Sequence, residues 1–523
     1  MGDGTRGRRG GGRALGGGGL PARTPRQRAA PGLAGRPSPR PANPQGATGS
    51  ARRDLDRAPV PPPQRPARRG PARTAGTRRV CDRPSRRRAF DDDRRRGHRP
   101  RLRRGVPGGR RMTRSAGRLL DGAARRAWQA WSNGDVEACE RLAETLSGPS
   151  RDHLLFLCCY VRQSYEKALA HYDALASDDR TPGTLDEPVI AAWLHLGRPD
   201  QAIEHVRRRR TGRSRISRSR ISRSRAVEQA LRVLDLRLTR PLGVRLDGTT
   251  ALAFVDHELA PYLPAVAATI DGVDVRAHLD TGGAFVVMGP QRAAELGVVT
   301  FPGGSSHHGL QRTQVRHGTI TELRLGAASL TNVPVEVLST LVGAQDLVII
   351  GTNILEQFLS TVDHPRSRLI LSPRYRPDAA ADHARLLADA PATTEIDFYL
   401  WSDHFMFTRG GFGARDDLNF FIDSGLVYVV QDDDASAPQQ ACLLAGSRHY
   451  RTWGVPRALA DRPHFDSPEP VSLGPLAQRH RLVATTRSRT TPWRSFGGVR
   501  IDGLLSHAFL KAYAWTLDFD RGQ

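Results

Sequence analysis

The chain has 523 residues, with 79 Lys and Arg against 53 Asp and Glu and a formal net charge of +26. A chain this long exceeds one hydrophobic core and predicts several domains. Its five Cys, an odd number spread along the chain, argue against a disulfide framework, and no apolar run approaches the ~18–20 residues of a membrane span. No basic start is followed by an apolar segment, so we predict no signal peptide and expect a cytoplasmic protein.

The positive charge is concentrated in the N-terminal segment. Residues 1–111 contain 31 Arg and 7 Asp, are rich in Gly and Pro, and hold one aromatic residue, Phe90. Such a composition cannot bury enough apolar surface to offset the entropy of ordering, so we predict a disordered tail. Three interpretations stay open: a basic arm for nucleic acid or an anionic surface, a solvated tail, or sequence that is not translated. The last is considered because Met112 is the first Met after Met1.

The remaining chain is nearly neutral. Residues 112–523 hold 48 basic and 46 acidic side chains, and ten of the Arg lie in the repetitive Arg/Ser tract 207–225. We predict that tract to be an exposed linker. Without it the body is mildly acidic, so the overall charge does not indicate a nucleic-acid partner, and an RNA-associated protein is the weakest of the functional hypotheses.

Residues 112–238 are predicted to be helical, because apolar residues recur every three or four positions. Tyr165–Leu169 matches Pro199–Ile203 at a spacing of 34 residues, and this period resembles the tetratricopeptide repeat. Repeats of that kind offer a groove to a peptide or protein partner. The alternative is a helical cap packed on the next domain.

From residue 239 onward, short runs of Val, Ile, Leu and Thr alternate with Gly, Pro and Asp, a pattern typical of an all-β region. Two stretches share one order of elements, which indicates an internal duplication. We place the first copy within residues 239–378 and the second within 379–523. The predicted fold class is therefore multidomain, with helical repeats followed by a duplicated β-barrel of two lobes.

In the first copy, two predicted strands over residues 265–279 lead to Asp280-Thr281-Gly282. An apolar strand ending at Gly351 lies 71 residues after Asp280, and a predicted helix over residues 353–359 and two strands follow. The second copy keeps this order: a strand over 418–422 leads to Asp423-Ser424-Gly425. Gly503 lies 80 residues after Asp423 and precedes a predicted helix containing Leu504, Leu505, Ala508 and Phe509, then a strand.

A single Asp-Thr/Ser-Gly triplet is weak evidence, because these residues also form ordinary turns. Two triplets, each after an apolar strand and each followed by strand, helix and strand, are much more specific. The pattern resembles the aspartic proteases that include pepsins and retropepsins. Residues 262–373 resemble a retropepsin-type lobe and residues 394–519 a more divergent second lobe, as in a bacterial two-lobed relative.

The resemblance implies an aspartic endopeptidase that acts on peptides or proteins without a cofactor or metal. Asp280 and Asp423 would form the catalytic pair, because two adjacent carboxyls cannot both ionise and so act as acid and base. The supporting residues are two hydroxyls that brace the loops, two loop glycines that admit backbone N–H groups, and two strand glycines behind the loops: Thr281, Ser424, Gly282, Gly425, Gly351 and Gly503.

Three other observations qualify this hypothesis. The expected flap, between Gly303 and Gly318 around His308, contains no Tyr, and the first lobe has one more predicted strand at its end than the second. His307 and His308 have no Cys or carboxylate at ligand spacing, so no metal site is predicted. A non-catalytic peptide-binding or scaffold protein, using the helical repeats and a retained protease fold, remains the alternative function.

Overall fold

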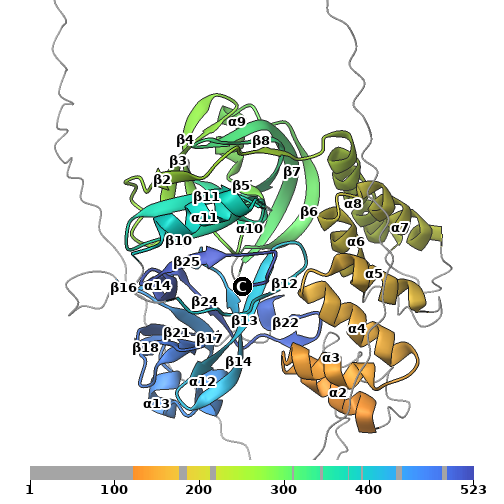
Figure 1. Cartoon of the computed structure of the whole chain (residues 1–523), viewed down its shortest axis with the longest axis vertical. Coiled ribbons are helices and arrows are strands. Elements are labelled where there is room, and N and C mark those ends of the chain that lie inside the picture. The colour runs from red at the N-terminus through yellow and green to blue at the C-terminus, as the bar shows by residue number, and fades with distance from the viewer. Residues whose placement is uncertain are drawn as a thin grey trace, which may run out of the picture. The chain divides into compact units, whose positions relative to one another are not determined.

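The computed structural model describes residues 122–175, 185–211, 220–308, 311–341, 346–374, 376–389, 393–430, 439–485 and 492–523. These residues all belong to one compact unit of the chain. Helices come first in that unit, and β-rich segments coloured green to blue follow them (Figure 1). The basic segment 1–111, predicted to be a disordered tail, lies outside the described residues.

The N-terminal helices pack against their neighbours in sequence: α2 Gly122–Ser132, α3 Val136–Glu144, α4 Pro149–Val161, α5 Tyr165–Ala174, α6 Asp186–His195, α7 Pro199–Thr211 and α8 Arg220–Thr239. Helix α3 illustrates the local cause: Asp135 caps it by accepting from the Ala138 N–H, and Val136, Cys139 and Ala143 bury one face. Helices α5 and α7 begin 34 residues apart, at the predicted period. Their assignment to tetratricopeptide-like repeats stays a prediction.

The Arg/Ser tract of residues 207–225, predicted to be an exposed linker, is helical at its ends. Helix α7 extends to Thr211 and helix α8 begins at Arg220, so both ends of the tract are helical, while residues 212–219 lie outside the described part. Arg has a high helix propensity, which explains how a repetitive polar sequence extends the two helices.

The end of α2 and the turn that follows it contact the second lobe directly. Trp131 is 1% exposed and its indole N–H donates to the Gly497 carbonyl at 2.9 Å. Beside it, the Asn419 amide donates to the Asn133 carbonyl at 2.9 Å. Trp131 shares a hydrophobic cluster with lobe residues including Phe407 and Phe421. The helices and the second lobe therefore share one core.

Trp131→Ala should destabilise the whole unit by about 3–5 kcal/mol, because it empties a shared core site and removes a hydrogen bond. Denaturant unfolding followed by circular dichroism measures the effect. Trp128→Ala is the matched control, since Trp128 lies on the same helix, is half-buried and packs its ring edge-on against His153. If the lobes of Trp131→Ala unfolded in a separate transition at an unchanged denaturant concentration, the helices would be an independent domain.

The first lobe is built on a sheet in the order β1-β8-β5-β9-β4-β3-β7-β6, which closes through an additional β7–β8 pairing. Its strands are β1 Gly243–Arg245, β3 Ala265–Ile270, β4 Val273–Asp280, β5 Val286–Met288, β6 Thr300–His308, β7 Gln311–Leu325, β8 Ala328–Leu338 and β9 Val348–Gly351. Strands β3 and β4 match the predicted hairpin, whose turn is formed by Asp271 and Gly272, both with positive φ. This lobe is a barrel, as the sequence pattern predicted.

The second lobe repeats the central pairings of the first. Strand β14 (Arg415–Ile422) pairs antiparallel with β13 (Phe405–Phe412) and parallel with β24 (Gly503–Leu505). Strand β17 (Leu443–Gly446) pairs antiparallel with β24 and parallel with β21 (Arg481–Thr485). In the first lobe, β4, β3, β9, β5 and β8 make the same pairings. The duplication inferred from the sequence thus appears as repeated strand connectivity.

The remaining strands of this sheet extend it at the edges: β12 Tyr399–Trp401, β18 His464–Asp466, β19 Val471–Leu473 and β20 Leu476–Gln478. Two short two-stranded sheets complete the lobe: β15 Val429–Val430 with β16 Gln439–Gln440, and β22 Ser495–Phe496 with β23 Val499–Arg500. Its short helices are α12 Ser447–Thr452, α13 Arg457–Ala460 and α14 His507–Leu510.

A four-stranded sheet joins the two lobes in the order β2-β11-β10-β25. Strands β2 (Thr250–Ala253), β10 (Phe358–Asp363) and β11 (Arg368–Pro373) flank the first lobe, and β25 (Ala514–Leu517) follows the second. Helix α11 (Pro377–Leu386), which the sequence pattern did not predict, packs on this sheet through His383, whose ring bonds Thr361 and Ser372. Backbone hydrogen bonds between β10 and β25 therefore connect the lobes.

Two predicted helices are shorter than expected. Helix α10 spans Thr352–Leu355, and Phe358 already begins β10. In the second copy, Leu504 and Leu505 belong to strand β24, and α14 begins only at His507. Every residue of strand β24 is buried, so both of its faces are covered and its apolar run mimics a helix face.

Candidate active site

Asp280 ends strand β4, a buried strand that pairs in parallel with β9. That register places Asp280 opposite Gly351. Asp423 follows strand β14 directly, and its N–H donates to the Leu505 carbonyl of β24 at 2.9 Å. Each carboxyl is therefore positioned at the end of a central strand of its lobe, and both remain half-buried rather than enclosed.

The two loops that follow these strands bind each other by reciprocal hydrogen bonds. The Thr281 N–H donates to the Ser424 hydroxyl at 2.9 Å, and the Ser424 N–H donates to the Thr281 hydroxyl at 3.0 Å. The Thr281 hydroxyl in turn donates to the Ile422 carbonyl at 2.8 Å. The side chains of Thr281 and Ser424 are both buried, so each loop supplies the hydrogen-bond partners that the polar groups of the other loop require.

The loop glycines bring backbone N–H groups to one carboxylate oxygen. Gly282 donates to Oδ1 of Asp280 at 2.7 Å, and Gly425, from the other lobe, donates to the same atom at 2.8 Å. A Cβ on Gly282 would lie 2.4 Å from Oδ1 of Asp423 and 3.2 Å from Oδ1 of Asp280. A Cβ on Gly425 would lie 2.1 Å from the carboxyl carbon of Asp280. The two carboxyls thus lie against the opposite loop, where a side chain has no room.

The strand glycines behave differently in the two lobes. Gly351 packs behind the first loop, where an added Cβ would lie 1.6 Å from the Ala284 carbonyl oxygen. Gly503 pairs with Phe420, three residues before Asp423, so it does not occupy the equivalent place. That place belongs to Ser506, which caps α14 as Gly351 caps α10. The prediction for Gly503 is therefore out of register, because the sequence does not reveal where β24 begins.

The surroundings of the two carboxyls favour protonation. Burial raises the pKa of Asp280, although the N–H groups of Gly282 and Gly425 partly oppose this by stabilising the carboxylate. Burial, and after it the charge of Asp280, raises the pKa of Asp423 well above its usual value. The Gly425 N–H also lowers the pKa of Asp423, but by less than burial and the charge of Asp280 raise it, so Asp423 is the more readily protonated of the two.

Two histidines near Asp280 were not predicted as part of the site. His308 ends strand β6 of the predicted flap, and His404 lies in the turn between β12 and β13. Both imidazoles lower the pKa of Asp280 to a smaller extent than burial raises it. The segment predicted to be the flap forms an antiparallel pair of β6 and β7, and Gly309 and Leu310 lie outside the described residues. His404 lies in the second copy, but before the strand that leads to Asp423, where the repeated order of elements begins, so that order gave no signal for it.

Residues 266–354 match the family model described as Aspartyl protease. The match covers β3, β4, the Asp280 loop and Gly351, and it supports a protease-like fold for the first lobe. A retropepsin-like aspartic protease from Rickettsia conorii is similar at 18% sequence identity, over 26% of this chain and 95% of that chain, with a TM-score of 0.20. No curated protein matches the chain.

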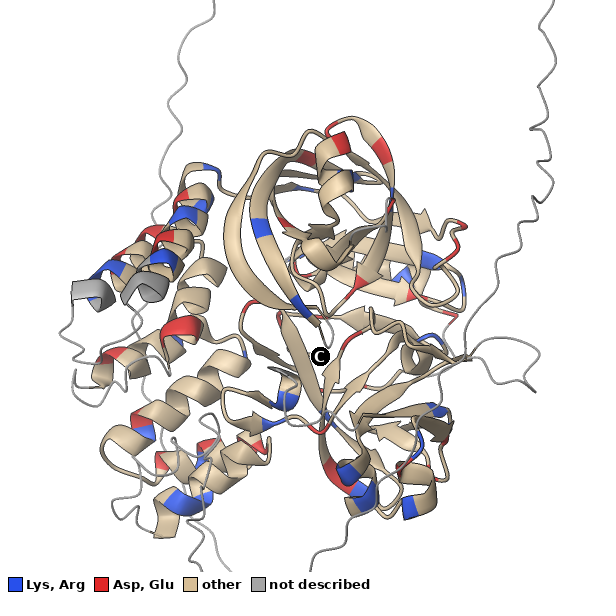
Figure 2. Cartoon of the chain, turned by 180° about the vertical axis from the view of Figure 1, so that it is seen from behind, with Lys and Arg blue, Asp and Glu red and all other residues tan. Residues whose placement is uncertain are grey.

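Other functional features are limited within the described part of the chain. No described helix is long and apolar enough to span a membrane. No group of three or more His, Cys, Asp or Glu among the described residues could hold a metal ion. Acidic and basic residues are intermixed over the helices and both lobes (Figure 2).

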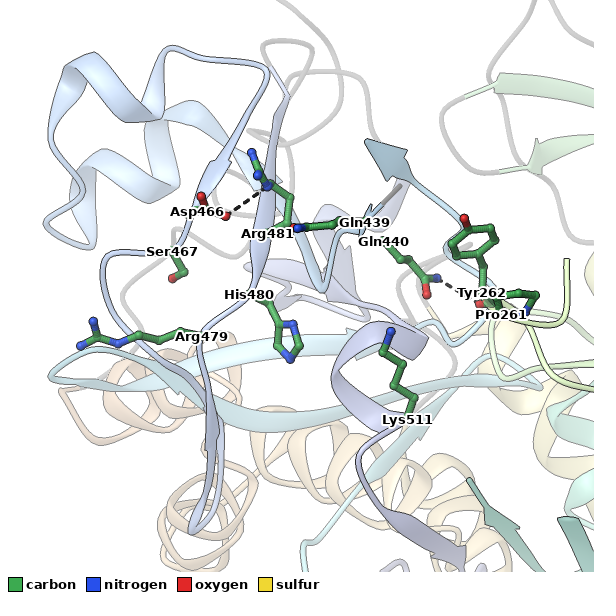
Figure 3. A pocket seen from close by; sticks show the side chains of 10 residues that line it. All are labelled: Pro261, Tyr262, Gln439, Gln440, Asp466, Ser467, Arg479, His480, Arg481 and Lys511. Carbon is green, nitrogen blue, oxygen red and sulfur yellow. Dashed lines mark hydrogen bonds and ion pairs between the residues drawn. The ribbon is translucent and has the colours of Figure 1, made fainter. Parts of the chain in front are cut away.

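A polar pocket of about 740 Å³ lies where a loop of the first lobe meets the second lobe (Figure 3). The Gln440 amide donates to the carbonyls of Tyr262 and Leu426, each at 3.1 Å, and so ties the first lobe to the segment after Gly425. Arg481 pairs with Asp466 at 3.1 Å. The residues that line this pocket help to hold the lobes together, and neither Asp280 nor Asp423 is among them.

Proposed function

We propose that the chain is an aspartic endopeptidase in which Asp280 and Asp423 activate water. The observation that carries this proposal is the exchange of hydrogen bonds between Thr281 and Ser424, which holds the two carboxyl-bearing loops together across the lobes. If the two Asp-Thr/Ser-Gly triplets were ordinary turns, they would not need to exchange hydrogen bonds with each other. The match of residues 266–354 to the aspartyl proteases supports the same function.

The charge distribution suggests how the pair would work. The carboxyl held by two N–H donors, Asp280, keeps its negative charge more readily and would take a proton from the attacking water. Asp423, with its more strongly raised pKa, would carry the shared proton and give it to the scissile carbonyl oxygen. An extended peptide would bind by strand-type hydrogen bonds near the β6–β7 hairpin.

The pH dependence of cleavage tests this proposal. The pair is active with one proton, and burial raises both pKa values above the usual 3.8. Activity should therefore persist above pH 3.8 and fall as the pH rises through the raised pKa of Asp423, when the shared proton is lost. The measurement is kcat/KM for an unfolded protein substrate between about pH 2 and 8. Activity that instead increases through neutral pH would assign the chemistry to another group.

Binding and cleavage of the same unfolded protein substrate distinguish the scaffold alternative from the peptidase. A scaffold would bind the unfolded protein at every pH and cleave it at none. Binding without cleavage across the full pH range would therefore contradict the peptidase and favour the alternative.

A further inference from the structure

A cavity of about 650 Å³ lies where α6, the end of α8 and the first lobe meet. Its walls include the apolar side chains of Leu242, Leu246 and Phe358. Leu238 and Val244, which also line it, are 45% and 41% exposed. Ligand sites typically measure roughly 300–1,000 Å³ and favour such junctions. The cavity therefore has the size and walls for a ligand with an apolar part.

Most charged groups in the wall already have partners. Glu356 is 3.0 Å from the His195 imidazole, and Asp403 is 2.5 Å from that of His404. Arg374 pairs with Asp520. Each of these carboxylates therefore already has a charged or hydrogen-bonding partner other than Arg237.

Arg237 is the exception among the charged groups of the inner wall. Its guanidinium lies 4.1 Å from the centre of the Phe285 ring, and burial lowers its pKa to about 10. Within the described part of the chain it has neither a hydrogen bond nor an ion pair. The lining residue Asp200 is exposed and bonds Gln201. The charges of Asp403 and Glu336 only partly offset the cost of burying Arg237, and a bound anion would relieve the rest.

Two buried polar atoms of the lining residues also lack partners. The His195 side chain is 8% exposed and Asn353 is 2% exposed, yet Nε2 of His195 and Oδ1 of Asn353 bond to no described group. Burial disfavours the charged His195 imidazole, but Glu356 outweighs it and raises its pKa, and in the protonated ring Nε2 is a donor. One donor and one acceptor match the carbonyl and N–H of an amide.

We propose that this cavity binds the C-terminal residue of a peptide with an apolar side chain. The carboxylate pairs with Arg237, the side chain enters the apolar part, and the last amide bonds to His195 and Asn353. Neither Asp280 nor Asp423 lines the cavity, so the inference does not rest on the proposed peptidase activity.

Calorimetric titration of the full chain tests the chemistry with three probes: N-acetyl-alanyl-leucine, its C-terminal amide, and octanoate. The peptide acid should bind at least about tenfold more tightly than the amide, because only the acid carries the charge that pairs with Arg237. Octanoate binding weaker than the peptide acid supports a peptide end. Octanoate binding as tight as the peptide acid would overturn the peptide source in favour of a fatty acid. Equal binding of acid and amide, or no binding of any probe, would overturn the proposal entirely.

Variants locate the site. Arg237→Gln should weaken binding of the peptide acid at least about tenfold, whereas Arg232→Gln should not. Arg232 is the matched control, since it lies on the same helix but stacks 4.6 Å over Phe301 instead. Leu238→Glu replaces an exposed residue, so it should fold, and its negative charge at the edge should repel the acid. Unchanged binding in either Arg237→Gln or Leu238→Glu, at unchanged melting temperature, would contradict this site.

Discussion

Asp280→Asn and Asp423→Asn are each expected to reduce cleavage of an unfolded protein by at least about a thousandfold. An amide matches a carboxyl in size but can neither take the proton of water nor give one to a carbonyl. Removing either partner also removes the shared proton, so the two single variants should be about equally inactive, and the double variant no worse. Initial rates on one labelled substrate measure this.

The fold control for these variants is their thermal stability at neutral pH. Burial raises the folded-state pKa of both carboxyls, so the stability they contribute is present below pH 3.8 and lost as the pH rises through the raised values. An amide cannot ionise, so neither variant should melt below the unmodified chain at neutral pH. Substantial activity in either variant would exclude the pair as the catalytic centre.

Gly351→Ala is expected to destabilise the chain by about 3 kcal/mol or more and to abolish cleavage. The new Cβ would lie 1.6 Å from the Ala284 carbonyl oxygen and 2.3 Å from that of Gly283. Both atoms are backbone of the loop that carries Asp280, so no side-chain rotation relieves the overlap. The loop must move, and the Thr281–Ser424 hydrogen bonds move with it.

The matched control is Gly248→Ala, because a Cβ there meets no atom within 4 Å and the residue has no positive φ. Denaturant unfolding of the two variants separates the overlap from the general effect of replacing glycine. If Gly351→Ala unfolded at the same denaturant concentration as Gly248→Ala, the claim that Gly351 packs tightly behind the loop would be contradicted.

The sequence predicted those parts of the site that repeat. Two Asp triplets after apolar strands located both loops, and strands β3 and β4 lie within one residue of the prediction. The start and end of an element were harder to predict where a strand is buried on both faces. The Leu504-Leu505 run suggested a helix, and that error moved the glycine predicted behind the second loop to Gly503 when Ser506 occupies that place.

Residues outside the repeated order of strands and Asp loops could not be predicted. His404 and Arg237 approach the first lobe only because the turn after β12 and the end of α8 pack beside it, and neither has a counterpart in the repeat. Periodicity reports which face of an element is buried, but it does not report which distant element covers that face.

The hydrogen bond from Gly425 to Asp280 joins residues 145 positions apart in the chain. At a synthesis rate of roughly 5–20 residues per second, the second loop leaves the ribosome roughly 7–30 s after the first. Until then Thr281 lacks the Ser424 hydroxyl, and β10 lacks its partner β25, which lies still later. The emerging polypeptide would therefore stay inactive toward its neighbours on the same messenger, and any peptidase activity would begin only after translation has passed both lobes.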